Sequence, residues 1–523
     1  MESHDQGGTL LIASTAPEPV RSPWPPPEVP TADFAGHVLR HAERLGDHPA
    51  LVDSASGRIV SYGELASASQ RAAASLAARG FGKDDVLALY SPNLPEFVST
   101  VLGVAMAGGA TTTANPLYTA GELAFQLRDS GARMVVTIPP FLDRATEAAR
   151  EAGIEAVLGY GDLLDGSGAA PARPGAPDDV VLLPYSSGTT GLAKGVELTN
   201  RAVVAHLTQL ESALPYTAED KIMAVAPMYH CMGLIVVVSH ALAQGATVVT
   251  MMRFDFEAFL RAMQDHRVTA TIIAPPIALG LARHPAVDDY DLSAVRWMGC
   301  GAAPLDPRIE EECATRLGCP FGQGYGMTEA TATISVPDIE RPETIVRGTS
   351  GQLLPGVEAR ATDPETGADL PPGAEGELLI RGPQLMRGYR GRPDATAATI
   401  DGDGWLHTGD LGTVDPDGRL RITDRLKELI KVKGLQVAPA ELENLLRAHP
   451  AVADAAVVGV PDERAGEVPK AFVVARAEVD RDEVMAWVAE RVAPHKRLRA
   501  LEVVDEIPKL PSGKVLRRVL RER

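Results

Sequence analysis

Apolar and polar positions alternate along the first third of the chain as expected for helices followed by buried strands. Residues 61–64 have the Ser-x-x-Glu spacing of a capping box, and apolar residues then recur at helical spacing until Gly80. The apolar run at 86–90 that follows is typical of a buried strand. The same succession returns with a capping box at 119–122 and an apolar run at 134–138. Such alternation predicts parallel sheets covered by helices.

The pattern changes twice further along the chain. Strand-like runs at 247–251, 269–274 and 295–298 extend the parallel type, whereas turn sequences at 363–367 and 415–418 indicate a small antiparallel layer. From Pro439 the order becomes helix, strand, strand, helix, strand, with strands at 455–460, 471–475 and 501–504 and a second helix at 482–492. We therefore expect an α/β fold, with a large N-terminal domain of parallel-sheet βα subdomains plus a small antiparallel layer, and a small α+β C-terminal domain.

Length and charge restrict the classes of protein that fit. A chain of 523 residues exceeds what one core supports, so at least two domains are expected. Fifty Lys and Arg against 69 Asp and Glu give a net charge of −19, which disfavours broad binding to nucleic acid or to anionic membranes. No apolar run approaches the roughly 20 residues of a membrane span. Residues 1–30, rich in proline, resemble no signal or transit peptide and are predicted to be an irregular arm.

The cysteine content and the C-terminal residues indicate where in the cell the protein is expected. Cys231, Cys300, Cys313 and Cys319 lack zinc-ligand spacing and are too few to stabilise a chain of this size through disulfides. We expect reduced thiols that lie in the core or line a pocket. The last residues, Arg-Glu-Arg, do not form a peroxisomal signal. The cytoplasm is the expected location.

The segment at 185–196, with the sequence YSSGTTGLAKGV, has the composition of a phosphate-binding loop. Its glycines allow tight turns that present backbone N–H groups, its hydroxyls add donors, and Lys194 adds charge. It is not a Walker A motif, because Leu192 and Ala193 separate Gly191 from Lys194. Apolar residues before it and helical spacing after Thr199 predict a loop between a strand and a helix.

Further segments fit the same kind of ligand, a nucleotide. The sequence QGYGMTE at 323–329 offers a tyrosine ring for stacking on a base, a hydroxyl for phosphate and a carboxylate for Mg²⁺. The sequence TGDLG at 408–412 places one carboxylate at a turn, where it could accept hydrogen bonds from both ribose hydroxyls. The sequences PMYH at 227–230 and PSGK at 511–514 are each unremarkable alone.

Taken in order, these motifs identify a family. Together with DRLKELIKVKGLQVAPAELE at 424–443, they resemble the adenylate-forming superfamily of acyl-CoA synthetases, luciferases and peptide-synthetase adenylation domains. The resemblance covers nearly the whole chain, and within the superfamily the motifs are most similar to those of 4-coumarate:CoA ligases. It implies an N-terminal adenylation domain at 1–424, a hinge at 425–427 and a mobile C-terminal lid domain at 428–523.

The resemblance implies a two-step reaction. A carboxylate and ATP give an acyl-AMP and pyrophosphate with the help of Mg²⁺, and CoA then forms a thioester and releases AMP. Lys514 corresponds to the catalytic lysine that bridges the acid and the α-phosphate, and His230 gates or lines the acyl pocket. Glu329 corresponds to the residue that holds Mg²⁺, and Lys427 to the hinge residue about which the small domain rotates between the two steps.

The remaining site residues also follow from the resemblance. The implied ATP and AMP site consists of Ser186, Ser187, Gly188, Thr189, Thr190, Lys194, Gln323, Gly324, Tyr325, Thr328, Asp410 and Arg425. Lys431 and Gln436 are implied to contact the adenylate, and Arg253, Lys433 and Gly434 to contact CoA. The implied acyl pocket consists of Tyr229, Met232, Gly301, Ala302, Gly326 and Met327.

The sequence specifies the carboxylic acid substrate less well than the reaction. The small residues at 301–303 leave room for a flat ring, which favours an aromatic propenoate such as 4-coumarate or cinnamate. At Met232 plant members commonly carry a tyrosine, so a medium-chain fatty acid stays an alternative. An adenylating enzyme that serves a carrier protein, a luciferase-like oxygenase and a nucleotide-binding regulator without activity are further alternatives. The expected partners are small molecules only (acid, ATP and CoA), without nucleic acid, membrane or an obligatory protein partner.

Overall fold

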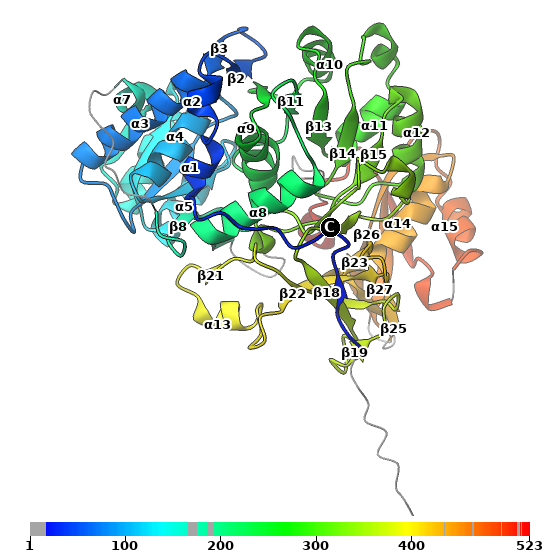
Figure 1. Ribbon diagram of the computed structural model, residues 1–523. Helices are drawn as coiled ribbons and strands as arrows, with labels where there is room; N and C mark the ends of the chain where they lie inside the picture. The colour runs from blue at the N-terminus through cyan, green and yellow to red at the C-terminus, as the bar shows by residue number, and fades with distance from the viewer. Residues whose placement is uncertain are drawn as a thin grey trace, which may run out of the picture.

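The computed structural model describes residues 17–165, 175–186, 193–432, 435–462, 465–492, 494–509, 513 and 515–523. Two largely parallel sheets, an antiparallel sheet and a C-terminal lobe make up these residues (Figure 1). The expected α/β fold class is confirmed. No helix in the described ranges is long and apolar enough to cross a membrane.

The first sheet has the strand order β21-β10-β8-β5-β4-β6-β7. Its central pairs are parallel, whereas β10 runs antiparallel to both of its neighbours and to the short β9. Its strands are β4 (Val86–Tyr90), β5 (Ala110–Ala114), β6 (Ala132–Thr137), β7 (Ala156–Gly159), β8 (Val180–Leu182), β9 (Tyr185–Ser186), β10 (Lys194–Thr199) and β21 (Gly388–Tyr389).

The predicted capping boxes begin two helices of this part. Ser61 and Glu64 cap each other's backbone N–H groups at the start of α3 (Tyr62–Ala78), and Thr119 and Glu122 do so at α5 (Ala120–Ser130). Gly131 ends α5 in the left-handed conformation, as a C-cap glycine does. The other helices near this sheet are α1 (Phe34–Val38), α2 (Ala42–Leu45), α4 (Pro95–Met106), η1 (Pro139–Phe141), α6 (Leu142–Ala152), α7 (Tyr160–Leu164) and α13 (Pro393–Ala397).

The second sheet has the order β15-β14-β13-β11-β12-β2-β3, parallel except for the last pair. Its strands are β2 (Pro49–Asp53), β3 (Ile59–Ser61), β11 (Lys221–Ala224), β12 (Thr247–Thr250), β13 (Ala270–Ile273), β14 (Trp297–Cys300) and β15 (Phe321–Gln323). The accompanying helices are α8 (Asn200–Ala213), η2 (Met232–Ser239), α9 (His240–Ala243), α10 (Phe256–Asp265), α11 (Pro275–Arg283), η3 (Pro285–Asp289) and α12 (Pro307–Leu317). Because the strands from β15 to β2 are parallel, their carboxyl ends share one edge.

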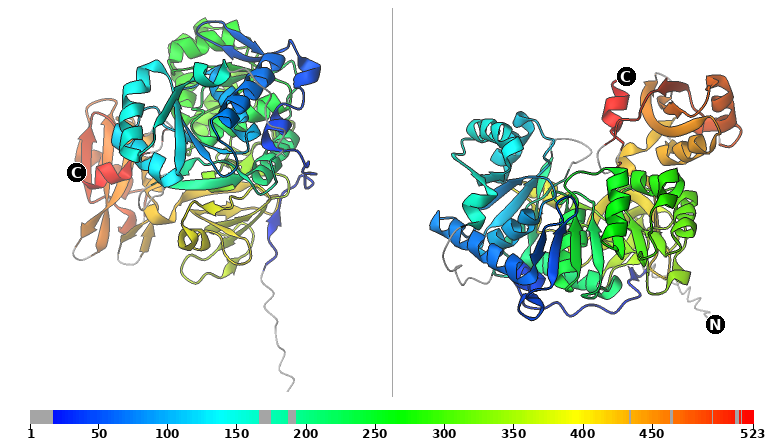
Figure 2. Two further views of the ribbon diagram at one scale, coloured as in Figure 1. Left: turned by 90° about the vertical axis from the view of Figure 1, so that its left-hand side faces the viewer. Right: turned by 90° about the horizontal axis from the view of Figure 1, so that it is seen from above.

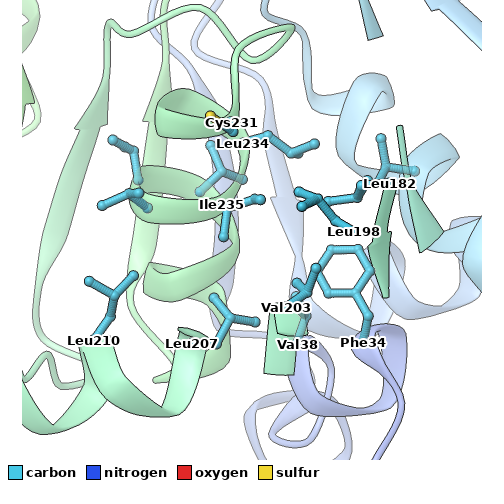
Figure 3. Packing of buried hydrophobic residues seen from close by; sticks show 14 of the residues in the cluster. Phe34, Val38, Leu182, Leu198, Val203, Leu207, Leu210, Cys231, Leu234 and Ile235 are labelled. Atoms are coloured by element: carbon cyan, nitrogen blue, oxygen red, sulfur yellow. The ribbon is translucent and has the colours of Figure 1, made fainter. Parts of the chain in front are cut away.

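A continuous core joins the two sheets. The π-helix η2 contacts β11 of the second sheet and α8, and α8 in turn contacts β10 of the first. Figure 3 shows Leu207 and Leu210 of α8 with Leu234 and Ile235 of η2, and Leu198 of β10 lies opposite them. Burying such side chains stabilises the junction by roughly 25 cal/mol per Å² of apolar surface.

The antiparallel layer has the order β1-β18-β20-β22-β23. It consists of β1 (Val20–Arg21), β18 (Glu358–Thr362), β19 (Asp369–Leu370), β20 (Gly376–Arg381), β22 (Leu406–Val414) and β23 (Leu420–Arg425). Short elements beside it are η4 (Thr328–Ala330), β16 (Ser335–Val336), η5 (Pro342–Thr344) and β17 (Gln352–Leu353). The prediction of an irregular arm at 1–30 is wrong for residues 20–21, because β1 pairs with β18 and Val20 is buried.

The residues after β23 form the C-terminal lobe, orange to red in Figure 2. It contains η6 (Leu426–Glu428), β24 (Ile430–Val432), β25 (Leu435–Val437), α14 (Pro439–Ala448), β26 (Val452–Asp462), β27 (Gly466–Ala475), α15 (Arg481–Ala489), η7 (Pro494–Lys496), β28 (Ala500–Val504) and α16 (Arg517–Arg521). The predicted order of helices and strands is confirmed. Arg517 forms ion pairs with Glu428, directly after the expected hinge, and with Glu443 of α14.

Candidate active site

The predicted phosphate-binding loop joins two antiparallel strands. Ser186 of β9 lies opposite Lys194 of β10 in the ladder, so a strand that was not predicted lies between the loop and the helix, whose predicted start after Thr199 is confirmed. The strand forms because apolar side chains alternate with polar ones from Lys194 to Thr199, and α8 begins only afterwards, capped by the Thr199 hydroxyl. Ser187, Gly188, Thr189 and Thr190 lie outside the described residues.

Segments that follow the parallel strands meet at the shared edge of the second sheet. Gly301 follows β14 and Gly324 follows β15, and they donate backbone hydrogen bonds to Ile273 and Cys300. A Cβ atom on Gly301 would lie 3.5 Å from the Met232 sulfur and 3.9 Å from the Gly324 carbonyl oxygen. The structure therefore brings together Met232, Gly301 and Gly324, which the sequence places in three separate motifs.

The adjoining glycine at 326 has a steric role. A Cβ atom there would lie 1.8 Å from the Ala332 carbonyl oxygen, so only glycine fits this close approach. Met327 directly precedes η4, and Ala302 adopts a φ of 72°, in the left-handed region. Gly326 and Met327 thus lie between β15 and η4, whereas Ala302 follows β14.

His230 and Cys231 follow β11 at the same edge. The Cys231 sulfur lies 3.8 Å from His230 Nδ1 and 3.8 Å from the Thr328 hydroxyl. The neighbouring thiol raises the pKa of His230. The Met232 N–H donates to Nδ1 at 3.3 Å, so in the neutral ring the proton resides on Nε2. Tyr229 is held through its carbonyl oxygen, which accepts a hydrogen bond of 2.6 Å from Thr113.

Tyr325, Asp410 and Arg425 form one cluster. The Tyr325 hydroxyl donates to Asp410 Oδ2 at 2.6 Å, and Arg425 Nε lies 3.0 Å from Oδ1. Asp410 and Arg425 are partners in the ladder of β22 and β23, and Gly409 turns the chain before them with a φ of 67°. Burial and the Asp410 charge raise the pKa of Tyr325 well above its usual value, so its hydroxyl stays a donor. The cluster presents a buried carboxylate, with 3% of its side chain exposed, beside a half-exposed guanidinium.

The side chain of Gln323 is hydrogen-bonded within the protein. Its side-chain oxygen accepts from the Leu305 N–H at 2.8 Å, and its nitrogen donates to the Leu305 carbonyl at 3.2 Å and to Glu310 at 2.8 Å. Glu310, fully buried, is also paired with Arg347. Because these partners occupy the Gln323 side chain, only its backbone remains to contact a nucleotide.

Glu329 has the surroundings expected of a residue that holds a nucleotide-bound cation. It is buried, one carboxylate oxygen accepts a hydrogen bond of 2.8 Å from Tyr389, and Lys194 lies 4.7 Å from the centre of the same tyrosine ring. In the described ranges no group of three His, Cys, Asp or Glu residues is arranged to hold a metal. A single carboxylate fits Mg²⁺, which proteins commonly bind through one or two carboxylates and the substrate phosphates.

The sequence did not single out Tyr389. It lies in the short run Met-Arg-Gly-Tyr at 386–389, whose only local signal is a glycine before an aromatic residue. Its importance comes from strand pairing, because β21 runs beside β10 and opposite η4.

Several predicted residues lie away from this cluster or outside the described part. Arg253 follows β12 at the same edge of the second sheet and is exposed between the exposed side chains of Met252 and Phe254. Lys431 and Gln436 face each other in the ladder of β24 and β25. Lys427 lies in η6, directly after Arg425 and Leu426. Lys433, Gly434 and Lys514 lie outside the described residues.

Gly513 is the one described residue of the PSGK motif at 511–514. A Cβ atom on Gly513 would lie 3.0 Å from Pro276 Cδ and 3.9 Å from Pro275 Cδ, at the start of α11. These prolines follow β13, so Gly513 of the C-terminal lobe approaches the edge at which Gly301 and Gly324 lie.

Comparisons with known proteins place the chain among AMP-binding enzymes. A family model described as AMP-binding enzyme matches residues 38–390, and the model of the AMP-binding enzyme C-terminal domain matches residues 441–514. The chain is 40% identical to 4-coumarate–CoA ligase 1 of Solanum tuberosum, over 99% of the chain and 97% of the relative. It is 42% identical to 4-coumarate–CoA ligase 5 of Oryza sativa subsp. japonica, over 95% of each.

Solved structures of the same architecture carry nucleotides. ATP-bound MatB from Rhodopseudomonas palustris superposes with a TM-score of 0.86 at 30% identity, covering 94% of this chain and 99% of MatB. The o-succinylbenzoate CoA synthetase of Bacillus subtilis, solved with its acyl-adenylate intermediate, gives a TM-score of 0.82 at 30% identity over 93% and 98% of the two chains.

Proposed function

We propose that this chain, which belongs to the AMP-binding enzyme family and is an AMP-forming acid–thiol ligase, acts on a small aromatic propenoate. The proposed acid is of the 4-coumarate or cinnamate type. It activates a carboxylic acid with ATP as an acyl-AMP and transfers the acyl group to CoA. Its 4-coumarate–CoA ligase relatives are about 40% identical over nearly the whole chain. Mg²⁺ as the cation, the residues of each site and the bounds of the domains are part of the proposal.

One observation carries the assignment of residues. The segment from Tyr325 to Glu329 spans two chemically different groups, with Tyr325 against Asp410 and Arg425 at one end and Glu329 near Lys194 at the other. Buried carboxylate and guanidinium groups suit the hydroxyls of a ribose, whereas a cation site beside a lysine suits phosphates. A nucleoside triphosphate bound along this segment would contact the Asp410–Arg425 pair with its ribose and the Glu329–Lys194 end with its phosphates.

In the first step a carboxylate oxygen attacks the α-phosphorus of ATP, and the bond to the β-phosphate breaks with its electron pair on pyrophosphate. The carboxylate is already a nucleophile, so the residues need to align it and to offset charge. Lys514 bridges the carboxylate and the α-phosphate, and Lys194 with the loop at 186–190 holds the departing pyrophosphate. Glu329 would hold Mg²⁺, which would supply positive charge against the phosphates.

In the second step the CoA sulfur attacks the acyl carbon, and the bond to AMP breaks. A site that holds pyrophosphate and Lys514 leaves no path for the pantetheine arm, so the lobe at 428–523 rotates about Lys427. Lys433, Gly434 and Arg253 then contact CoA, and Lys431 and Gln436 contact the adenylate in the first orientation. Arg253 keeps the charge of the lysine expected there and offers a planar donor group.

The acyl pocket consists of Tyr229, His230, Met232, Gly301, Ala302, Gly326 and Met327. Because a Cβ atom on Gly301 would lie 3.5 Å from the Met232 sulfur, we infer that the thioether and the backbone of Gly301 form the two walls of an acyl slot. Such a slot suits a flat ring. A carrier-protein substrate is the second candidate, and no contact in the described part of the chain favours it.

We predict that Met232→Tyr raises the preference for a phenolic ring. The new hydroxyl can bond the 4-hydroxyl of 4-coumarate, and one such hydrogen bond is worth about 1 kcal/mol, or about fivefold in relative kcat/KM. Thioester formation is measured with 4-coumarate, cinnamate, benzoate and octanoate for the wild type, Met232→Tyr and the control Met232→Phe. An unchanged ratio of 4-coumarate to cinnamate in Met232→Tyr would contradict the placement of Met232. If the wild type preferred octanoate, the proposal of an aromatic acid as substrate would be wrong.

A further inference from the structure

Tyr389 belongs to a segment that links two parts of the active site. The strand β21 pairs with β10, and Val196 and Tyr389 are partners in that ladder. On the β10 side, the backbone N–H of Arg387 donates to Glu197 and that of Arg390 donates to Gly195. Three residues before Tyr389, the Met386 N–H donates to the Glu329 carbonyl at 2.8 Å. The backbone of this segment therefore fixes the distance between β10 and η4.

The side chain of Tyr389 makes the same connection. Its hydroxyl donates to Glu329 Oε1 at 2.8 Å, and both residues are buried, with exposed fractions of 8% and 5%. Because a carboxylate oxygen only accepts, the phenol hydroxyl is the donor in this bond. On its ring face lies the Lys194 ammonium, 4.7 Å from the ring centre. Tyr389 thus contacts the Glu329 carboxylate through its hydroxyl and the Lys194 ammonium through the face of its ring.

We propose that Tyr389 is a positioning residue that orients Glu329 toward the nucleotide-bound cation and Lys194 toward the departing pyrophosphate. This inference rests on the proposed function of Glu329 and Lys194. A neutral donor on Oε1 fixes the carboxylate rotamer without removing its charge, and it leaves Oε2, which has no hydrogen-bond partner among the described residues, to face a ligand. The ring fixes the lysine without neutralising it.

The two contacts can be separated by substitution. Tyr389→Phe removes the hydroxyl and keeps the ring, so it frees Glu329 and leaves Lys194 in place. Tyr389→Leu removes both contacts. The inference predicts that the first variant changes dependence on Mg²⁺ and that the second also weakens binding of the phosphates.

The measured quantities are the Mg²⁺ concentration that half-saturates ATP–pyrophosphate exchange, and calorimetric ATP binding with and without Mg²⁺. For Tyr389→Phe the half-saturating Mg²⁺ concentration is expected to rise about tenfold, the size of effect seen when a metal ligand loses its supporting hydrogen bond. ATP binding without Mg²⁺ is expected to stay within about twofold of the wild type. Thioester formation from supplied acyl-AMP and CoA, which needs no pyrophosphate site, is expected to be unchanged.

Tyr62→Phe is the matched control for loss of a buried phenol. The Tyr62 hydroxyl donates to the Ala246 and Leu242 carbonyls at 2.8 and 3.2 Å, within the core beside η2 and α9. This variant is expected to lower the thermal midpoint as Tyr389→Phe does, without changing dependence on Mg²⁺. An equal Mg²⁺ shift in Tyr62→Phe would show a general loss of stability and overturn the inference.

Glu329→Gln separates failure of the inference from failure of the proposed function. If Glu329→Gln shifts the dependence on Mg²⁺ and Tyr389→Phe does not, Tyr389 has no positioning role. If neither variant shifts it, the assignment of Glu329 to the cation is wrong, and the inference falls with it.

Discussion

Replacing Lys514 by alanine is expected to reduce acid-dependent ATP–pyrophosphate exchange by about 10²- to 10³-fold, the usual effect of removing a group that stabilises developing charge in a transition state. The enzyme supplied with acyl-AMP and CoA is expected to form thioester at close to the wild-type rate. The reason is the role proposed for Lys514, which is to bridge the carboxylate and the α-phosphate in the first step only. The proposed rotation of the lobe removes Lys514 from the site before the second step.

Lys509→Ala is the control for charge on the same loop. Lys509 pairs with Asp454 at 2.5 Å within the C-terminal lobe, and its backbone forms a bridge with that of Val515. Its loss removes one positive charge near Lys514 without touching the reaction, so both half-reactions are expected to persist. Equal losses of both half-reactions in Lys514→Ala would contradict rotation of the lobe between the steps.

Replacing Asp410 by asparagine is expected to lower kcat/KM for ATP by about 100-fold. Asparagine can still accept from the Tyr325 hydroxyl, but it leaves the Arg425 guanidinium without the opposite charge at 3.0 Å and offers the ribose a weaker acceptor. Because Arg425 is half-exposed, the stability change is expected to be only about 1–2 kcal/mol. Steady-state kinetics measures kcat/KM for ATP, and thermal unfolding measures the change in stability.

Asp338→Asn is a matched control for this substitution. Asp338 is a buried carboxylate that pairs with the exposed Arg341 at 2.7 Å, outside the site. It is expected to cost a similar amount of stability and to leave the KM for ATP unchanged. If the two asparagine variants changed the KM for ATP equally, Asp410 would have no specific part in binding the nucleotide.

Local signals in the sequence predicted most of the helices and strands. Capping boxes at Ser61 and Thr119 and the proline that begins α14 fix helix starts through contacts within a few residues, so the sequence alone reveals them. The strand β10 was not predicted, although Val196 and Leu198 alternate with polar residues as in a strand. The strand is short and is followed directly by the cap of α8 at Thr199, which is the stronger local signal. The short β1 was missed because its stability comes from pairing with β18, more than 300 residues away.

The candidate site, like the fold, was predicted only where local sequence signals are sufficient. Motifs gave the residue types, and their order identified the family, but spacing along the chain did not show that Tyr325 would bond Asp410, 85 residues later. Spacing also did not show that Leu305 and Glu310 would occupy the Gln323 side chain, or that Tyr389 would lie between Glu329 and Lys194. These contacts depend on which strands become neighbours, which is a property of the whole fold.

The central claim is that an oxygen atom of the acid attacks the α-phosphorus of ATP and leaves with AMP when CoA attacks the acyl carbon. The most direct test supplies 4-coumarate labelled with ¹⁸O in both carboxylate oxygens, together with ATP, Mg²⁺ and CoA, and analyses the products by mass spectrometry. The account predicts one ¹⁸O atom in AMP, one in the thioester and none in pyrophosphate. Thioester formation with unlabelled AMP, or ¹⁸O in inorganic phosphate with release of ADP, would contradict it.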